Sequence, residues 1–423
     1  MRRVRVAFGA LLALAASAGG LLQADDLAAQ TPRRPYPQHT AYAAGSILPS
    51  HRSAEERDAA ALTFYRRWKA RYLKAGCGPG RYYVAVNADG KFPDRKVLSI
   101  SEGHGYGMLL AVSFAGADRD AKSIFDGLYR YFRDHPSDRN PDVMAWKQLG
   151  DCADAPDGRD TATDGDLDVG YALLLADRQW GSAGAIDYRA EAKKVIRAIR
   201  AVELHPADAT IQLGSWVSLD QPRHFHSTRS SDWMPGHFKA FRAATGDPRW
   251  ATAANRVYAL VKRLQTVYSP AAGLLPDFLE RTNAAPRPAS PGFLEGPNDG
   301  AYFYNACRTP WRLGLDALLS GDARGRAAVR KISAFLRTRA AGDPERLRAG
   351  FRLDGADLPG NDYVDLAFLA PAAVGALLEP EHPEWLEGLW DRIVAAPLDE
   401  GDYYGNTLKA LALLAASGNA WKP

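Results

Sequence analysis

The sequence predicts an all-α protein built as an α/α toroid, in which a ring of inner helices is surrounded by outer helices. Three observations predict this fold. About twelve segments show helical periodicity, these segments alternate between amphipathic and apolar all round, and strand-like alternation is confined to the stretch from Tyr82 to Val86. The segments are spaced too irregularly for a solenoid of short repeats such as a tetratricopeptide array.

The two ends of the predicted fold are set by composition. Three arginines precede an apolar run over residues 6–22, so residues 1–30 are expected to be a signal peptide. Residues 31–50 are interpreted as a Pro-rich leader, and residues 51–423 are predicted to form one domain. No later stretch is long and apolar enough to span a bilayer, so we expect a secreted or periplasmic protein.

The outer helices are predicted from apolar residues that recur on one helical face. The first begins at a capping box, in which Ser53 is followed three residues later by Glu56. The apolar faces of the outer helices comprise Leu62, Tyr65, Trp68 and Tyr72; Ile124, Leu128 and Phe132; Val257, Leu260, Val261 and Leu264; Val329, Ile332, Phe335 and Leu336; and Trp385, Leu389, Trp390 and Ile393.

The inner helices are predicted from segments that are apolar nearly all round, as expected of helices buried on every side. These segments cover residues 107–114, 167–175, 364–378 and 408–416. In a toroid the inner helices point their ends at one face, where long loops build a substrate groove. Polar and aromatic residues concentrate in such loops, so we expect the chemistry there.

Composition excludes several classes of partner. The net charge of +4 is spread over 102 charged residues, 53 basic and 49 acidic, without the long basic block that nucleic-acid binding would favour. The nine histidines lack the spacing of a metal site, and we expect no cofactor.

Cys77 and Cys152 lie in loop-like surroundings and could pair in an oxidising compartment. A monomer is expected.

The stretch SISEGHGYGMLLA puts a carboxyl group, Glu102, at a glycine-rich entry into a buried helix. Glu102 is therefore a candidate catalytic residue. It could instead merely stabilise the helix start, which is worth about 1 kcal/mol or less. The glycine run resembles a phosphate-binding loop only weakly, because no strand precedes it and no lysine follows in the required place.

A second acidic stretch, ATDGDLD, contains Asp164, Asp166 and Asp168. It superficially resembles a calcium loop, but Val169 and Leu175 occupy positions that require Gly and Glu. A solvated acidic cluster at a helix start is one interpretation. Because the helix that follows is very apolar, we expect at least one of these carboxylates to face the groove.

Five sequence blocks in order resemble those of glycoside hydrolase family 8. They read SEGHGYGMLLAV, MAWK, ATDGDLDVGYALLLADRQW, SSDWMPGHFKAF and YNACRTPWRLGLD. The third block departs from the family signature only at Val169 and Gly170. The resemblance implies an (α/α)6 barrel with a substrate groove at one end, in agreement with the helix count. It also implies an inverting, endo-acting hydrolase of β-1,4-linked polysaccharide, which needs a proton-donating acid and a water-activating carboxylate.

By the resemblance, Glu102 is the general acid and Asp164 grips the sugar beside the scissile bond, with Asp166 a weaker candidate for that task. Many family members have Asp where this chain has Asn305, and an amide cannot act as a base. The chain resembles the branch in which a Glu on the preceding loop supplies the base. That loop, residues 276–298, offers Glu295 and Glu280, with Asp277 and Asp299 at its edges. We select Glu295 because it lies closer to the YNACR block.

The remaining candidates are residues that would bind sugar. Arg308 should hydrogen-bond in the catalytic centre by its motif position, or else form a structural salt bridge. Asn305 is expected to orient the water or a sugar hydroxyl. The predicted aromatic platforms for sugar rings are Trp146, Trp216, Trp233 and Tyr403 or Tyr404, any of which could instead be core.

The substrate class stays open at this stage. The branch with Asn includes enzymes that act on cellulose-type glucans, mixed-linkage β-glucans and chitosan, and we favour β-1,4-glucan. A chitosan site would need free carboxylates, which the Asp-rich loop of residues 151–168 could supply. Two alternatives from other classes are a polysaccharide lyase, whose product absorbs in the ultraviolet, and a catalytically silent carbohydrate-binding protein.

Overall fold

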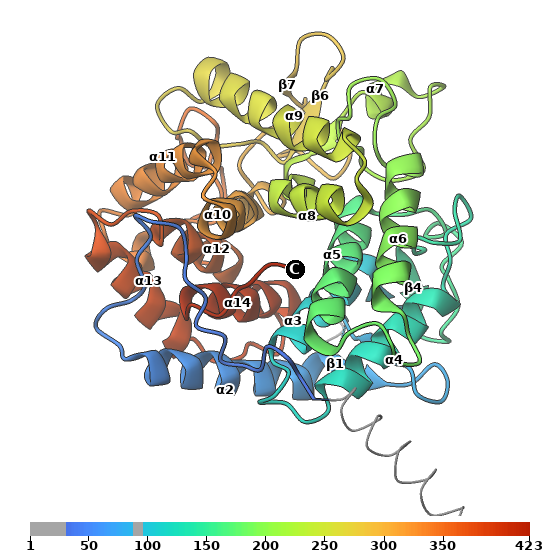
Figure 1. Ribbon diagram of the computed structural model, residues 1–423. Helices are drawn as coiled ribbons and strands as arrows, with labels where there is room; N and C mark the ends of the chain where they lie inside the picture. Colours follow the sequence, from blue (N-terminus) through green and yellow to red (C-terminus); the bar gives the residue numbers. More distant parts are fainter. Residues whose placement is uncertain (1–30, 88–95) are drawn as a thin grey trace, which may run out of the picture.

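The computed structural model describes residues 31–87 and 96–423, and the predicted signal peptide lies outside them. In the described residues, six helices form an inner ring in which each helix packs against the next and the last closes on the first (Figure 1). The inner helices are α3 (Ser101–Ser113), α5 (Thr163–Trp180), α8 (Pro235–Thr245), α10 (Thr309–Ser320), α12 (Leu366–Ala376) and α14 (Tyr403–Ala416).

Six outer helices surround this ring, each packed against an inner helix. They are α2 (Ala54–Tyr72), α4 (Ala121–Asp134), α6 (Tyr188–Val202), α9 (Arg249–Arg263), α11 (Ala323–Arg339) and α13 (Pro383–Ala395). A short helix, α7 (Pro222–Phe225), lies in a loop. The predicted all-α toroid is therefore confirmed.

The pattern of burial explains which helices lie inside. Almost every residue of α3, α5, α12 and α14 is buried, as their apolar sequences require. The inner helices α8 and α10 were harder to recognise because they carry charged residues. Asp316 of α10 is buried and pairs with Lys239 of α8 at 2.6 Å, so these charges are matched within the ring.

The outer helices follow their amphipathic sequences. On α4, Ile124, Phe125, Leu128 and Phe132 are buried and face the inner helices. The predicted capping box begins α2, where the Ser53 side chain accepts the Glu56 N–H and the Glu56 side chain accepts the Ser53 N–H.

Three small antiparallel sheets lie in the connections. They pair β1 (Leu73–Ala75) with β2 (Tyr82–Val84), β3 (Val97–Ile100) with β4 (Lys147–Leu149), and β6 (Phe278–Glu280) with both β5 (Thr228–Arg229) and β7 (Arg287–Pro288). The strand expected near Tyr82 is β2. The other strands are only two to four residues long, too short to show strand-like alternation in the sequence.

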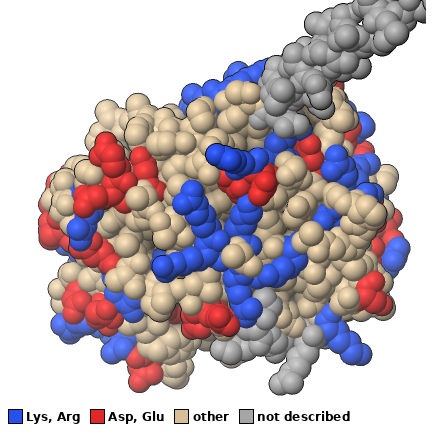
Figure 2. All heavy atoms as spheres, turned by 90° about the horizontal axis from the view of Figure 1, so that it is seen from below, with Lys and Arg blue, Asp and Glu red and all other residues tan. Residues whose placement is uncertain are grey.

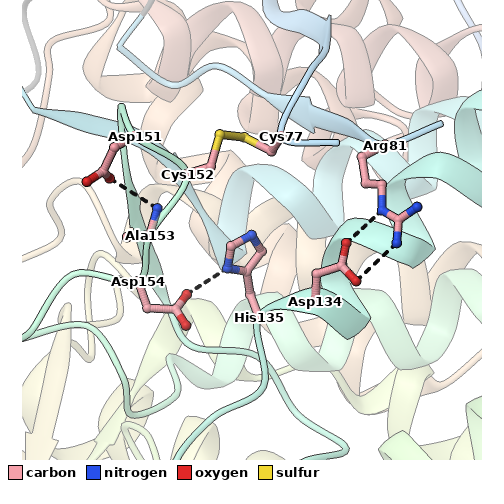
Figure 3. The surroundings of a disulfide bond; sticks show 8 residues. All are labelled: Cys77, Arg81, Asp134, His135, Asp151, Cys152, Ala153 and Asp154. Carbon is pink, nitrogen blue, oxygen red and sulfur yellow. Dashed lines mark hydrogen bonds and ion pairs between the residues drawn. A yellow bond between two sulfur atoms is a disulfide. The ribbon is translucent and has the colours of Figure 1, made fainter. Parts of the chain in front are cut away.

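A disulfide joins Cys77 to Cys152, as the sequence suggested (Figure 3). Cys77 lies in the turn between β1 and β2, and Cys152 lies in the turn that follows β4. Close by, His135 contacts Asp154 at 2.8 Å and Arg81 pairs with Asp134 at 2.7 Å. The disulfide thus ties the acidic loop after β4 to the β1–β2 hairpin.

Residues 31–50 are part of the barrel, so their interpretation as a separate leader was wrong. The segment crosses the carboxyl-terminal ends of the inner helices, the face toward the viewer in Figure 1, where the chain also ends. Its backbone N–H groups at Arg33, Tyr36, Thr40, Ala43 and Ile47 donate to carbonyls of Gln179, Ala115, Gly418, Leu318 and Leu377. Helix ends have carbonyls without intrahelical partners, and this strap supplies donors to them.

Charge is distributed unevenly over the flank of the barrel that contains α2. Figure 2 shows this side from below, with Lys and Arg side chains gathered near the middle of the face. On α2, Arg66 and Arg67 are exposed, whereas Lys69 pairs with Asp118 at 2.8 Å. No helix in the described residues is long and apolar enough to cross a membrane.

Candidate active site

Three inner helices bring polar side chains together at their amino-terminal ends. Glu102 is the second residue of α3, Asp164 is the second residue of α5, and Arg308 immediately precedes α10. One nitrogen of Arg308, Nη1, donates to Glu102 Oε2 at 2.6 Å and to Asp164 Oδ2 at 3.0 Å. The ring closure thus assembles residues that are more than 200 positions apart.

Local backbone contacts explain how Glu102 reaches this end of the barrel. Strand β3 leads directly into α3, and the Ser101 N–H donates to the Trp146 carbonyl at 2.9 Å. The glycines of the SEGHG stretch let α3 approach α5 closely. A Cβ on Gly105 would lie 2.7 Å from Asp168 Cβ, and one on Gly165 would lie 2.4 Å from the Ser101 carbonyl carbon.

The surroundings of Glu102 favour its protonated form. Burial raises its pKa to about 7, the Arg308 guanidinium opposes this rise, and the negative charge of Asp164 reinforces it. The Glu102 side chain retains 15% exposure, so its carboxyl group can reach the solvent side. A residue that merely stabilised the helix start would be ionised, since only the anion interacts favourably with the helix dipole.

Asn305 connects Arg308 to Glu295. Arg308 Nη2 donates to Asn305 Oδ1 at 2.8 Å, and Asn305 Nδ2 donates to Glu295 Oε2 at 2.7 Å. The other Glu295 oxygen lies 3.4 Å from Arg229 Nη2. The Glu295 side chain is nevertheless 49% exposed, so it is held on one side and open on the other.

Two buried aspartates hold the segments that carry Asn305 and Glu295. Asp277 Oδ1 accepts the N–H groups of Phe303, Asn305 and Ala306. Burial raises the pKa of Asp277 to about 7, although these donors oppose the rise. Asp299 accepts the Glu295 N–H at 3.1 Å together with those of the two flanking residues. The aspartates at the edges of the loop are thus structural supports.

The alternative base, Glu280, lies elsewhere in the structure. It is on β6, where its carboxylate pairs with Arg223 at 3.0 Å and with Arg287. Burial acts to raise its pKa, but the two arginines outweigh burial and the pKa lies below its ordinary value. The structure therefore brings Glu295, and not Glu280, to the cluster around Arg308.

Asp166 does not face the groove, so its prediction as a sugar ligand was wrong. It is fully buried, and its Oδ1 accepts the Met144 N–H at 2.9 Å. Asp166 is two residues beyond Asp164, which is a rotation of about 200° around a helix at 3.6 residues per turn. The two carboxylates consequently point to opposite sides of α5.

The predicted aromatic platforms separate into two groups. Trp146 and Trp216 are partly exposed, and Trp146 lies next to Lys147 while Trp216 contacts the His224 ring. Trp233 is fully buried in the core with its Nε1 donating to Thr228, so it is not a platform. Tyr403 is 7% exposed and packs edge-on against Tyr72, so its ring offers no free face.

The last aromatic candidate, Tyr404, is half-buried. Its hydroxyl donates to the Tyr304 carbonyl at 2.6 Å, and Arg308 lies 5.6 Å from its ring centroid. Although Tyr403 is no platform, its hydroxyl lies against the backbone of Gly103, beside Glu102. Both tyrosines therefore line the catalytic cluster rather than the groove.

Sequence reasoning missed three residues of this cluster. Tyr106, one turn after Glu102, accepts a hydrogen bond from Arg308 at 3.0 Å. Arg229 contacts Glu295, as described above. Asp232 is fully buried, and burial raises its pKa to about 7 against the effect of Arg229. Asp232 lies in the SSDW block, which was a signal, whereas nothing in the sequence pointed to Arg229.

The described residues contain no group of three or more His, Cys, Asp or Glu that could hold a metal ion. What the cluster offers is a carboxyl group with a raised pKa, a partly exposed carboxylate, and an arginine and an amide between them. Such a pair of carboxyl groups is the equipment of glycoside hydrolysis.

A family model described as glycosyl hydrolases family 8 matches residues 51–418. The chain belongs to glycosyl hydrolase family 8. It is 40% identical over 390 residues to a β-glucanase of Niallia circulans, covering 92% of each chain. It is 34% identical to an endoglucanase of Bacillus sp. (strain KSM-330), covering 92% of this chain and 82% of that one.

The solved structures include a similar family 8 barrel. The apo structure of a β-1,3-1,4-glucanase from Paenibacillus sp. X4 matches with a TM-score of 0.87 and 39% identity. The match covers 93% of this chain and 100% of the other. Membership of the family establishes the chain as a glycoside hydrolase, and the resemblance read from the five sequence blocks was correct.

Proposed function

We propose that this family 8 hydrolase cleaves β-glucan chains internally with inversion, using Glu102 as general acid and Glu295 as general base. The proposal rests on one chain of contacts, from Glu102 through Arg308 and Asn305 to Glu295. Two side chains stand between the carboxyl groups, so these groups do not touch. Inverting enzymes separate their carboxyl groups by roughly 6.5–9.5 Å to admit a water molecule.

Glu102 would supply the proton. With a pKa of about 7 it holds this proton at neutral pH and can give it to the glycosidic oxygen as the bond breaks. Asp164, held by Arg308, would grip the sugar beside the scissile bond. Its negative charge would also stabilise the positive charge that develops on the sugar ring in the transition state.

Glu295 would activate the water. Asn305 donates to one of its oxygens and Arg229 approaches the other, which fixes the direction of the carboxylate. The open side of Glu295 leaves room for a water on the sugar face opposite Glu102. Attack from that face inverts the anomeric configuration. In this arrangement Asn305 positions the base and takes no proton itself.

An uncharged glucan is the substrate class that the loop charges favour over chitosan. Chitosan subsites need free carboxylates to meet ammonium groups. In the acidic loop, Asp154 contacts His135 (Figure 3), Asp157 pairs with Lys147 at 2.6 Å, and Asp160 pairs with Arg139 at 3.1 Å. Asp157 and Asp160 are therefore already matched by cations of the same chain, and the Asp154 carboxylate is engaged by the His135 ring. The relatives that are named as glucanases support the same choice.

The chain is also proposed to act outside the cytoplasm. The Cys77–Cys152 disulfide persists in an oxidising compartment and is rare in a reducing one. The predicted signal peptide, which precedes the described residues, would direct export. Sequencing the amino terminus of the protein recovered from culture fluid or periplasm tests this proposal, and an intact residue 1 in a cytoplasmic fraction would contradict it.

The function is tested by reducing-sugar release from carboxymethyl cellulose, lichenan and chitosan. We expect the wild type to act on the glucans, and Glu102→Gln and Glu295→Gln to lose about 10²- to 10⁴-fold in kcat. Glu280→Gln is the matched control and should keep most activity. Proton NMR of the first products should show the α-anomer from a β-linked chain.

Each contrary result has a clear meaning. Full activity in Glu295→Gln would exclude it as the base. Greater activity on chitosan than on either glucan would overturn the substrate class, and a β-anomeric first product would overturn inversion. A product that absorbs in the ultraviolet would indicate a lyase, and binding without cleavage of any glycan would indicate a carbohydrate-binding protein.

A further inference from the structure

A second acidic pair lies behind the catalytic cluster, on the opposite side of α5. Asp166 and Glu203 are both fully buried, and their carboxyl groups lie within hydrogen-bonding reach of each other. Glu203 immediately follows α6. Two ionised carboxylates cannot form a hydrogen bond, because neither carries a donor hydrogen. One proton must therefore be shared by this pair.

The remaining contacts of Asp166 and Glu203 do not supply enough hydrogen-bond donors for their carboxyl oxygens, so the shared proton is needed. Asp166 Oδ1 is satisfied by the Met144 N–H. Among the described residues, the Thr161 hydroxyl is the one donor that lies beside Glu203. The remaining carboxyl oxygens, including Asp166 Oδ2, have no donor in the described part of the chain unless the pair itself carries a proton. An unmatched pair of buried carboxylates would be costly, so the structure requires the acid–carboxylate form.

The pair connects two loops that carry partly exposed tryptophans. On the Asp166 side, Met144 is two residues before Trp146. On the Glu203 side, the Glu203 carbonyl accepts the Gln212 N–H at 2.8 Å, four residues before Trp216.

Thr161 extends the connection toward Trp216. Its side-chain oxygen accepts the Ser215 N–H at 2.9 Å, and its own N–H donates to the Ser215 side chain at 3.0 Å. A continuous set of hydrogen bonds thus runs between the two tryptophan loops through the shared proton.

The charged neighbours of the pair all favour retention of the proton. The charge of Asp164 on α5 acts on Asp166, and the charge of Asp232, which precedes α8, acts on Glu203. Both are acidic, and no cation is among the groups that act most strongly on the pair. Burial, the largest effect, raises the pKa of both groups. The pair therefore retains one shared proton at neutral pH.

We propose that Glu203 is a positioning residue for substrate binding, which with Asp166 holds the Trp146 and Trp216 loops together through one shared proton. Loss of the proton at alkaline pH places two like charges in contact and loosens both loops. Because these loops flank the catalytic centre and contribute no reacting group, the loosening raises KM more than it lowers kcat. The proposal rests on the proposed function only for this kinetic consequence.

The test compares Glu203→Gln with Glu203→Ala. The glutamine amide donates to Asp166 at every pH, whereas alanine offers no donor. At pH 6 we expect Glu203→Gln to keep KM on lichenan within about twofold of the wild type, and Glu203→Ala to raise it at least fivefold. Between pH 6 and pH 9 the wild-type KM should rise at least threefold more than that of Glu203→Gln.

A second measurement does not depend on activity. Hydrogen exchange of the Met144 and Ser215 amides should show protection factors that fall at least tenfold from pH 6 to pH 9 in the wild type and stay constant in Glu203→Gln. Equal alkaline behaviour of the wild type and Glu203→Gln in this exchange would overturn the proposal. A wild type that cleaves no glycan, but shows the expected exchange, would refute the proposed function alone.

Discussion

Arg308 is the residue on which the electrostatics of the centre depend. It touches Glu102, Asp164, Tyr106 and Asn305, and it is almost fully buried. Around it lie four carboxyl groups, those of Glu102, Asp164, Asp232 and Glu295, and the guanidinium of Arg229. The guanidinium of Arg312, one turn below, is paired with the further carboxylate of Asp168. Acids therefore outnumber cations in a buried space, and the imbalance is relieved when Glu102 holds a proton.

This imbalance predicts the pH dependence of the enzyme. In the proposed mechanism Glu102 acts in its protonated form, so kcat/KM should fall as the pH rises through about 7, the pKa of that group. Asp164 raises this pKa, so Asp164→Asn should shift the alkaline limb of its residual activity to lower pH. A pH profile of kcat/KM for both proteins checks this, and an unshifted limb would contradict the assigned coupling.

Single residues also show where sequence reasoning fails. Trp146 and Trp233 look alike in the sequence, since both stand in blocks that resemble the family motifs. Only the packed structure shows that Trp146 is partly exposed and Trp233 is fully buried. The prediction failed at Asp166 for another reason. The sequence shows that Asp164 and Asp166 point to different sides of the helix, but it does not show which side of α5 faces the groove.

At the scale of elements, the first turns of three inner helices are aligned. Tyr106, Asp168 and Arg312 lie four residues after Glu102, Asp164 and Arg308, and they form a second layer one turn below. In this layer Arg312 donates to both oxygens of Asp168, at 2.8 and 2.7 Å. His237 of α8 also contacts Asp168, at 2.9 Å. The buried ion pair fixes α5 against α10 beneath the catalytic layer.

The close contact between α3 and α5 gives a prediction at this scale. In Gly165→Ala the new Cβ would lie 2.4 Å from backbone of Ser101, which cannot move without displacing Glu102. We expect a loss of about 3 kcal/mol or more in unfolding free energy and a large loss of kcat. Gly184→Ala is the control, since a Cβ there meets nothing within 4 Å. Urea unfolding of both variants gives the answer, and equal stability would refute the steric argument.

At the scale of the molecule, the strap of residues 31–50 crosses the end of the barrel opposite the catalytic centre (Figure 1). This strap donates hydrogen bonds to carbonyls at or just after the carboxyl-terminal ends of five inner helices. Its Tyr36 side chain packs against Phe114, with ring centroids 4.7 Å apart. No helical or strand pattern in the sequence predicts such a segment, because its extended backbone forms hydrogen bonds with residues that are distant in the sequence. This is why residues 31–50 were misread from composition.

Removal of the strap should therefore destabilise the whole ring. A chain that begins at residue 51 loses five backbone hydrogen bonds, each worth about 1 kcal/mol net, so we expect a loss of roughly 3–5 kcal/mol. A chain that begins at Thr31 keeps them and serves as control. Thermal unfolding compares the two chains, and the pH profile of the shorter one should be unchanged because the strap lies far from Glu102.

The sequence by itself determined the features that depend on local order. Periodicity showed the helices and their alternation, the capping box showed where α2 begins, and ordered motifs singled out Glu102, Asp164, Arg308 and the loop that carries the proposed base. These features are visible because a helix repeats every 3.6 residues and its faces differ in burial.

Only the tertiary structure decided which of those residues meet. It distinguished Glu295 from Glu280, turned Asp166 away from the groove and buried Trp233. It also showed that Arg229 contacts Glu295 and that Glu203 lies beside Asp166. The physical reason is that burial and ionisation depend on neighbours distant in the sequence, and these become neighbours only when the ring of helices closes.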